Sequence, residues 1–131
     1  MNVDESLFAR LSTDAGVLAL VGTRIYPVEL PQTPTLPAIT YMMTSEPTEH
    51  LMNETSSTIK RAMFRVMSWD TSWSSVITMA AAVSTSLDAF AGLLGGATGQ
   101  RCWVTQVNQA DLADDLTGWK RRILDFELWQ A

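Results

Sequence analysis

The chain has 131 residues and a hydrophobic fraction of 47%, which suits one domain over residues 1–131, since domains commonly run to about 100–150 residues. No stretch approaches the ~18 consecutive apolar residues that would span a bilayer, which argues against a membrane partner. Nine basic residues against fourteen acidic ones give a formal net charge of −5, and this balance disfavours a protein that grips DNA, because phosphate binding needs a basic surface.

The N-terminal segment from Asp4 to Leu20 is predicted to be helical, because its apolar residues recur near helical spacing. These residues are Leu7, Phe8, Leu11, Ala15, Leu18 and Val21. The polar residues 12–14 are expected to divide the segment into two short helices, with Asp14 as the N-cap of the second. Gly22 is placed to end that helix.

Residues 23–37 contain four of the five prolines, so they are predicted to form an extended, ordered connection and neither a helix nor a central strand. A short first strand is expected over Ala38–Met42. Residues 45–57 are polar and rich in turn formers, which predicts a long loop between two antiparallel strands.

The next strand, from about Ile59 to Trp69, shows clear two-residue alternation. One face carries Ala62, Phe64, Val66 and Ser68, and the other carries Arg61, Met63, Arg65, Met67 and Trp69. A long helix is expected to follow, capped by Asp70 or Thr71 and running to about Ala91. Its predicted apolar stripe is Val76, Ile77, Ala80, Val83, Leu87 and Phe90.

Glycines at 92, 95, 96 and 99 predict a flexible connection, after which two more strands are expected over Arg101–Asp111 and Trp119–Trp129. In the last strand, Leu124, Phe126 and Leu128 share one side. The predicted fold class is therefore α+β: an antiparallel four-stranded sheet with one long helix packed on a face, plus short N-terminal helices.

Few residues are candidates for a catalytic or metal site. The sole histidine, His50, lies in the acidic loop near Glu46 and Glu49, but it lacks the partner set of a metal site. Cys102 begins an apolar strand, which favours a buried, inert thiol in a protein that folds in a reducing cytoplasm.

The aspartates at 111, 114 and 115 lack the glycine and terminal glutamate of a calcium loop, so a solvated strand end or a charged contact with another subunit is favoured. The glycine-rich residues 92–100 follow a helix and contain no lysine–serine pair, unlike a phosphate-binding loop. We therefore expect no catalytic, cofactor-binding or metal site.

The tryptophans, methionines and arginines on the strand face opposite the predicted core are the more informative feature. A monomer rarely exposes so much aromatic and methionine surface, and tryptophan and arginine are enriched at protein interfaces. The predicted subunit-interface residues are Arg61, Met63, Arg65, Met67, Trp69, Trp119, Arg121 and Trp129. Further contacts are expected from the loop residues Glu46, Glu49, His50, Leu51 and Met52.

Several short motifs in this order resemble the tail-completion, or tail-terminator, family of long-tailed phages and phage-like particles. The resemblance covers the chain from about Leu7 to Trp129. Its carriers are the run from Ala19 to Pro27, the run from Leu36 to Tyr41, His50-Leu51, Arg65-Val66 before the long helix, and the closing run from Leu124 to Trp129.

The resemblance implies a hexameric ring in the virion, at the head–tail interface, that caps the tail tube and joins it to the head connector. It also implies no cofactor and no catalysis. DNA would pass through the lumen without specific binding, which the acidic charge permits because like charges repel the phosphate backbone. The alternatives are a head-completion (connector or stopper) protein of the same particle, and a small-ligand-binding α+β domain, which would need a concave site with convergent polar groups.

Overall fold

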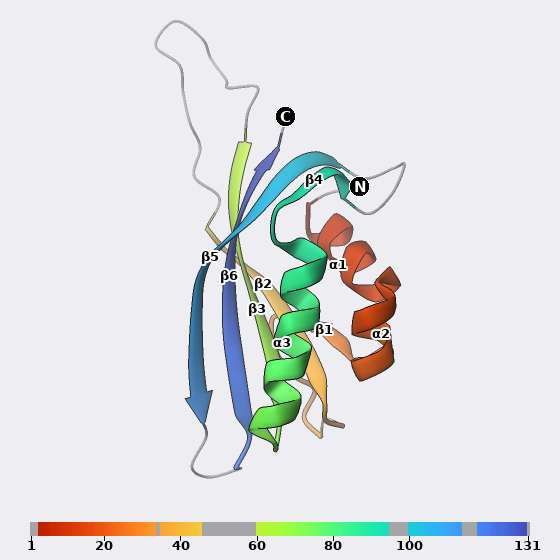
Figure 1. Cartoon of the computed structure of the whole chain (residues 1–131), viewed down its shortest axis with the longest axis vertical. Coiled ribbons are helices and arrows are strands. Elements are labelled where there is room, and N and C mark those ends of the chain that lie inside the picture. The colour runs from red at the N-terminus through yellow and green to blue at the C-terminus, as the bar shows by residue number, and fades with distance from the viewer. Residues whose placement is uncertain (1–2, 34, 46–59, 95–99, 114–117, 131) are drawn as a thin grey trace, which may run out of the picture.

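The computed structural model describes residues 3–33, 35–45, 60–94, 100–113 and 118–130 (Figure 1). In chain order the elements are α1 (Val3–Thr13), α2 (Ala15–Val21), β1 (Ile25–Pro27), β2 (Ala38–Ser45), β3 (Lys60–Asp70), α3 (Trp73–Leu87), β4 (Phe90–Leu94), β5 (Gln100–Ala113) and β6 (Lys120–Gln130). The α+β class predicted from the sequence is confirmed.

The sheet is larger than predicted: it has six strands in the order β1-β2-β3-β6-β5-β4. The prediction of a four-stranded antiparallel sheet is wrong, because β1 runs parallel to β2 and β4 pairs with β5. The four predicted strands are the four central ones, and the two missed strands lie at the ends of the order. The sheet is therefore mixed, with its one parallel pair at an edge.

The proline-rich connection is attached to the sheet by its own backbone and by an arginine. Ile25 lies opposite Ile39 in the parallel pair, and the Arg24 guanidinium donates to the carbonyl of Pro37 at 2.7 Å. Pro27 ends β1 at the sheet edge, where a missing amide hydrogen is tolerated. The segment is thus an ordered connection that also supplies a short strand.

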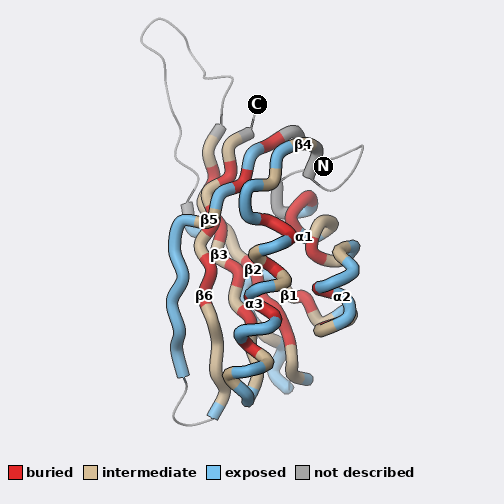
Figure 2. The backbone as a smooth tube through the Cα atoms, in the orientation of Figure 1, coloured by how far each residue is buried: buried red, intermediate tan, exposed pale blue. Residues whose placement is uncertain are grey.

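The helices cover one face of the sheet, as Figures 1 and 2 show. Helix α3 packs on β3, β5 and β6, while α1 and α2 pack beside α3. The core between these layers draws on every helix and on five of the strands. It contains Leu7, Leu11, Val17, Val21, Ile25, Ile39, Tyr41, Ala62, Phe64, Val66, Val76, Met79, Ala80, Val83, Leu87, Cys102, Val104, Leu124, Phe126 and Leu128.

The predicted alternation of β3 and β6 is confirmed. Phe64 lies directly opposite Phe126, and both side chains are 1% exposed on the helix-covered face. Their strand neighbours on the same face, Val66 and Leu124, are also fully buried. A period of two residues therefore separates a buried face from a half-buried one along both strands.

Helix α3 is shorter than predicted. It ends at Leu87 and not near Ala91, because Ala89 adopts a positive φ of 58° and turns the chain into β4. Its N-cap is Ser72, in place of the predicted Asp70 or Thr71. Within the predicted stripe, Ile77 is 45% exposed. The buried stripe is Val76, Met79, Ala80, Val83, Ser86 and Leu87.

The division of the N-terminus into two helices is confirmed, with its caps. Asp14 accepts a hydrogen bond from the amide of Val17 at 3.1 Å, and Gly22 ends α2 with φ of 58°. The predicted apolar stripe is less accurate, because Phe8 and Leu18 are each 40% exposed.

Arg10 ties α1 to the end of α3. Its Nε and Nη2 both donate to the carbonyl of Ser86, at 3.2 and 3.1 Å, and its guanidinium lies 4.7 Å from the ring centroid of Phe90. We expect Arg10→Ala to lower the free energy of unfolding by about 1–2 kcal/mol, because a part-buried carbonyl loses two charged donors. Urea unfolding would measure this loss, and Arg10→Lys should recover part of it; an unchanged midpoint for Arg10→Ala would contradict the assignment.

Candidate functional site

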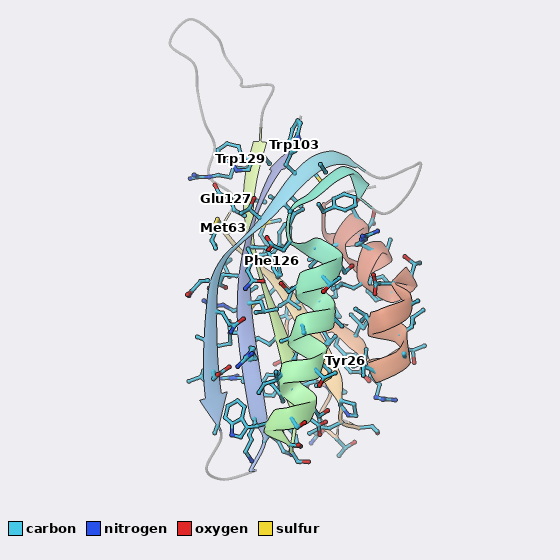
Figure 3. All side chains as sticks on the ribbon, viewed as in Figure 1. Tyr26, Met63, Trp103, Phe126, Glu127 and Trp129 are labelled. Carbon is cyan, nitrogen blue, oxygen red and sulfur yellow. The ribbon has the colours of Figure 1, made fainter. Side chains whose placement is uncertain are left out.

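The sheet surface away from the helices, which we call the open face, is formed by three neighbouring strands in register. Side chains from β3, β6 and β5 lie side by side in five rows across it. The rows are Arg61–Trp129–Trp103, Met63–Glu127–Thr105, Arg65–Asp125–Asn108, Met67–Ile123–Ala110 and Trp69–Arg121–Leu112. Figure 3 labels Met63, Glu127 and Trp129 on this face, whereas Phe126 points toward α3.

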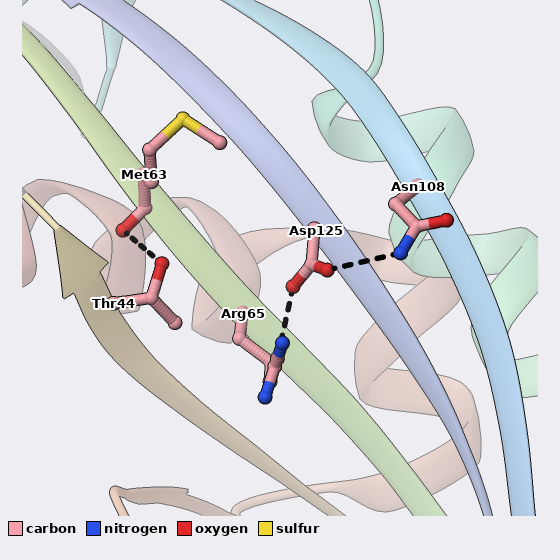
Figure 4. Close-up of polar contacts among 5 residues, drawn as sticks. All are labelled: Thr44, Met63, Arg65, Asn108 and Asp125. Atoms are coloured by element: carbon pink, nitrogen blue, oxygen red, sulfur yellow. Dashed lines mark hydrogen bonds and ion pairs between the residues drawn. The ribbon is translucent and has the colours of Figure 1, made fainter.

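The acidic side chains of the open face are paired with arginines of the same chain. Arg65 Nε donates to Asp125 Oδ1 at 2.9 Å, and Asn108 Nδ2 donates to the other carboxylate oxygen at 3.4 Å (Figure 4). Arg61 Nη1 lies 3.3 Å from Glu127 Oε1. The hydrogen bond to Asp125, with their mutual attraction, raises the pKa of Arg65.

The aromatic side chains of the open face are partly covered by arginines. The Arg61 guanidinium lies 5.4 Å from the ring centroid of Trp129, and that of Arg121 lies 4.8 Å from the centroid of Trp69. Trp69 also meets Trp119 edge to face, with centroids 6.5 Å apart. These tryptophans are half-buried, so the face is a packed layer of cationic and aromatic side chains in the free chain.

The structure thus brings together on this surface all the interface residues predicted from β3, β6 and the residue before β6. Strand β5 adds three exposed apolar side chains: Trp103, Val107 and Leu112 are 47%, 46% and 45% exposed. Sequence reasoning missed Val107 and Leu112, because β5 carries a bulge between Gln106 and Asn108 that shifts its alternation. The run from Thr105 to Ala113 offers no regular apolar period that would have placed them.

Asp111 pairs within its own chain, on the helix-covered side. Its two carboxylate oxygens accept from Arg122 Nε and Nη2 at 2.7 and 3.1 Å. Asp111 is exposed near the end of β5, as a solvated strand end would be, and its expected contact with another subunit stays a prediction. Hydrogen bonding from Arg122 lowers the pKa of Asp111, with burial opposing and the attraction to Arg122 adding to the effect.

We expect Asp111→Asn to lower the free energy of unfolding at neutral pH by less than about 1 kcal/mol, because the Asp111 side chain is 43% exposed to screening solvent. Since its pKa is depressed in the folded chain, the contribution is present above the unfolded pKa and is lost as pH falls through the folded one. The free energies of unfolding of the wild-type chain and Asp111→Asn, measured with urea from neutral to acid pH, should therefore converge. A difference that stays constant with pH would contradict this assignment.

The remaining candidates show no chemical site within the residues that the structure describes. Cys102 is buried, with 1% of its surface exposed, as predicted. Among the described positions, no group of three potential metal ligands gathers, and no helix has the length and hydropathy to cross a membrane. Glu46, Glu49, His50, Leu51 and Met52, together with Asp114 and Asp115, lie outside the described residues.

Comparisons with known proteins give a shared fold and a family. Among solved structures, the chain is similar to one in the "Virion of native gene transfer agent (GTA) particle", with a TM-score of 0.69 and 20% identity over 98% of this chain and 93% of that one, which shows a shared fold. A search of curated proteins finds no match. A family described as "Tail completion protein gp17" matches residues 5–131. Because that match spans nearly the whole chain, the chain belongs to the tail completion protein gp17 family, a family of structural virion proteins and not of enzymes.

Proposed function

We propose that this tail completion protein forms a ring that caps the tail tube and joins it to the head connector. The observation that carries the proposal is the open face, where tryptophans, methionines and arginines from three strands form one packed surface. Such a side-chain set is typical of protein interfaces and gives the protein a binding surface without a reaction centre. In the assembled particle this face packs against an adjoining subunit.

The ring is proposed to be a hexamer at the top of the tail tube, with the tail tube protein on one side and the connector on the other. The net charge of −5 on each chain suits a lumen through which DNA passes without specific binding, since like charges repel phosphate. The loop residues Glu46, Glu49, His50, Leu51 and Met52 are proposed as further contacts, on their sequence alone.

Two measurements test this function together. Gold labelling of a tagged chain in intact particles should place it at the head-proximal end of the tail. Complexes released from those particles should have the mass of a discrete oligomer, near six copies of the 14.4 kDa chain. A label on the capsid side of the connector would favour the head-completion alternative, and a monomer on assembled tails would overturn the ring.

A further inference from the structure

Strand β5 has a long outer edge that β4 covers only in part. The pairing with β4 involves Gln100–Val104, whereas the pairing with β6 runs from Cys102 to Ala113. From Thr105 to Ala113, the side of β5 that faces away from β6 has no partner strand among the described residues, and we call this stretch the free edge. Figure 1 shows it as the lower half of the β5 arrow, and Figure 2 shows it as mostly exposed.

The structure also shows where internal pairing stops. The chain turns at Asp88 and Ala89 before β4 begins, so β4 reaches no further along β5 than the pair Phe90–Val104. One carboxylate oxygen of Asp88 then accepts the amide of Gln106 at 2.9 Å. This bond gives a partner to the amide of Gln106, which lies just past the end of the pairing with β4. A further strand could therefore pair with β5 from Val107 onward.

The free edge lacks most of the devices that prevent strands from pairing between molecules. Protective edges carry lysine, proline or unpaired charges, and the residues from Thr105 to Ala113 include no lysine, arginine or proline. Their one charged side chain, Asp111, is neutralised by Arg122. Val107 and Leu112 add exposed apolar surface. An edge of this kind is a template for a further strand.

A second open edge lies at the opposite end of the sheet, on β2. Strand β1 pairs only with Ile39–Tyr41, so β2 from Met42 to Ser45 lacks a partner on that side among the described strands. Beside it is an open pocket of about 310 Å³ lined by Pro27, Val28, Tyr41, Met42 and Met43.

Val28, in the wall of this pocket, is unusual in two respects. It is 59% exposed, and its φ is 64°, a conformation that is unfavourable for a β-branched side chain. Its amide donates to the carbonyl of Tyr41 at 2.8 Å, which holds the strained residue against β2. An exposed apolar side chain kept in a strained conformation next to an apolar pocket indicates a contact site.

We infer that copies of this chain join edge to edge: the free edge of one copy pairs with the β2 edge of the next, and Val107 or Leu112 enters the neighbour's pocket. The occupant is a second copy, because each chain carries both an exposed apolar edge and a pocket of matching chemistry at opposite ends of one sheet. Such a contact is heterologous, and its repetition gives a ring when the rotation between successive copies closes, as the proposed ring requires. The inference rests on the proposed ring, and it adds an edge contact to the contact that the open face makes with an adjoining subunit.

Hydrogen exchange on the ring released from particles tests the edge directly. Those amides of residues 107–113 that point away from β6 are expected to exchange at least about tenfold more slowly in the ring than in the dissociated chain, because strand pairing protects amides. The amides of α3, which packs on the helix-covered face of the sheet, should exchange equally in the two states. A ring with unprotected edge amides would overturn the edge contact and leave the ring standing, whereas a chain that is monomeric on assembled tails would overturn both.

The oligomer masses of two double-lysine variants, one at the free edge and one on the helices, test the same contact. The edge variant Val107→Lys/Leu112→Lys should weaken self-assembly at least about tenfold, because lysines guard strand edges. The control variant Leu18→Lys/Ile77→Lys makes the same charge change at side chains that are 40% and 45% exposed on α2 and α3. The control should assemble like the wild-type chain, and circular dichroism should show both variants folded. Equal assembly of the two variants would overturn the inference.

A mixing experiment tests whether two different edges meet. The pocket variant Val28→Lys, at an exposed position, should stay monomeric alone, as should the edge variant. Mixed in equal amounts, they should form a complex of two copies and no larger species, since one intact edge meets one intact pocket. A mixture that stays monomeric where the wild-type chain assembles, or a variant that assembles alone, would overturn the pairing of these two edges.

Discussion

Phe126→Ala is expected to lower the free energy of unfolding by about 3–5 kcal/mol, enough to remove much of the stability of a domain of this size. Phe126 is 1% exposed and lies opposite Phe64 in the centre of the sheet, under α3. Removing the phenyl ring would leave a cavity. Strand β6 cannot shift to close it, because it is hydrogen-bonded to β3 on one side and to β5 on the other. Urea unfolding followed by circular dichroism measures the loss, and Phe64→Ala should give a similar value.

Phe8→Ala is the matched control for this prediction. Phe8 is 40% exposed, and its ring contacts Tyr41 with centroids 6.1 Å apart. Losing that contact should cost less than about 1.5 kcal/mol. A loss for Phe126→Ala no larger than that for Phe8→Ala would contradict the placement of the core between α3 and the sheet.

Val66→Asp and Met67→Asp are expected to have opposite consequences, although the two residues are adjacent in β3. Val66 is fully buried on the helix-covered face, so an unpaired carboxylate there should cost several kcal/mol and unfold the chain. Met67 is half-buried on the open face, opposite Ile123. An aspartate at this position reaches solvent, so the chain should fold and should fail to pack against its partner in the particle.

Circular dichroism and particle assembly distinguish these outcomes. For Met67→Asp we expect a native spectrum together with a loss of tail completion in a complementation assay. If Met67→Asp unfolds the isolated chain, the two faces of β3 have been assigned backwards. If the variant folds and completes tails normally, the open face is not the contact surface.

The sequence predicted those features of the fold that local chemistry determines. A strict period of two residues in β3 and β6 assigned their faces correctly, because one face is fully buried and the other carries long, half-buried side chains. Asp14 and Gly22 were recognised as caps, since capping depends on a few neighbouring atoms. The interface residues predicted from these strands do lie together on one surface.

The missed features depend on contacts between distant segments. Three residues cannot form a recognisable strand alone, and Ile25–Pro27 is extended because β2 lies beside it. Strand β4 lies where the sequence predicts the end of a helix and a glycine connection, because the turn at Ala89 has no glycine to indicate it. The exposed apolar residues of β5 follow a bulge whose position depends on pairing with β6.

The pairing of Arg61 with Glu127 and of Arg65 with Asp125 has a consequence for the conditions under which the particle holds together. Two of the arginines on the open face already have counter-charges from the same chain, so a partner need not supply them. Dissolved salt screens the attraction between opposite charges on two molecules. It has little effect on a contact formed by the apolar surface of tryptophan and methionine. A junction built on this face should therefore tolerate a wide range of ionic strength, as a structure exposed to changing surroundings requires.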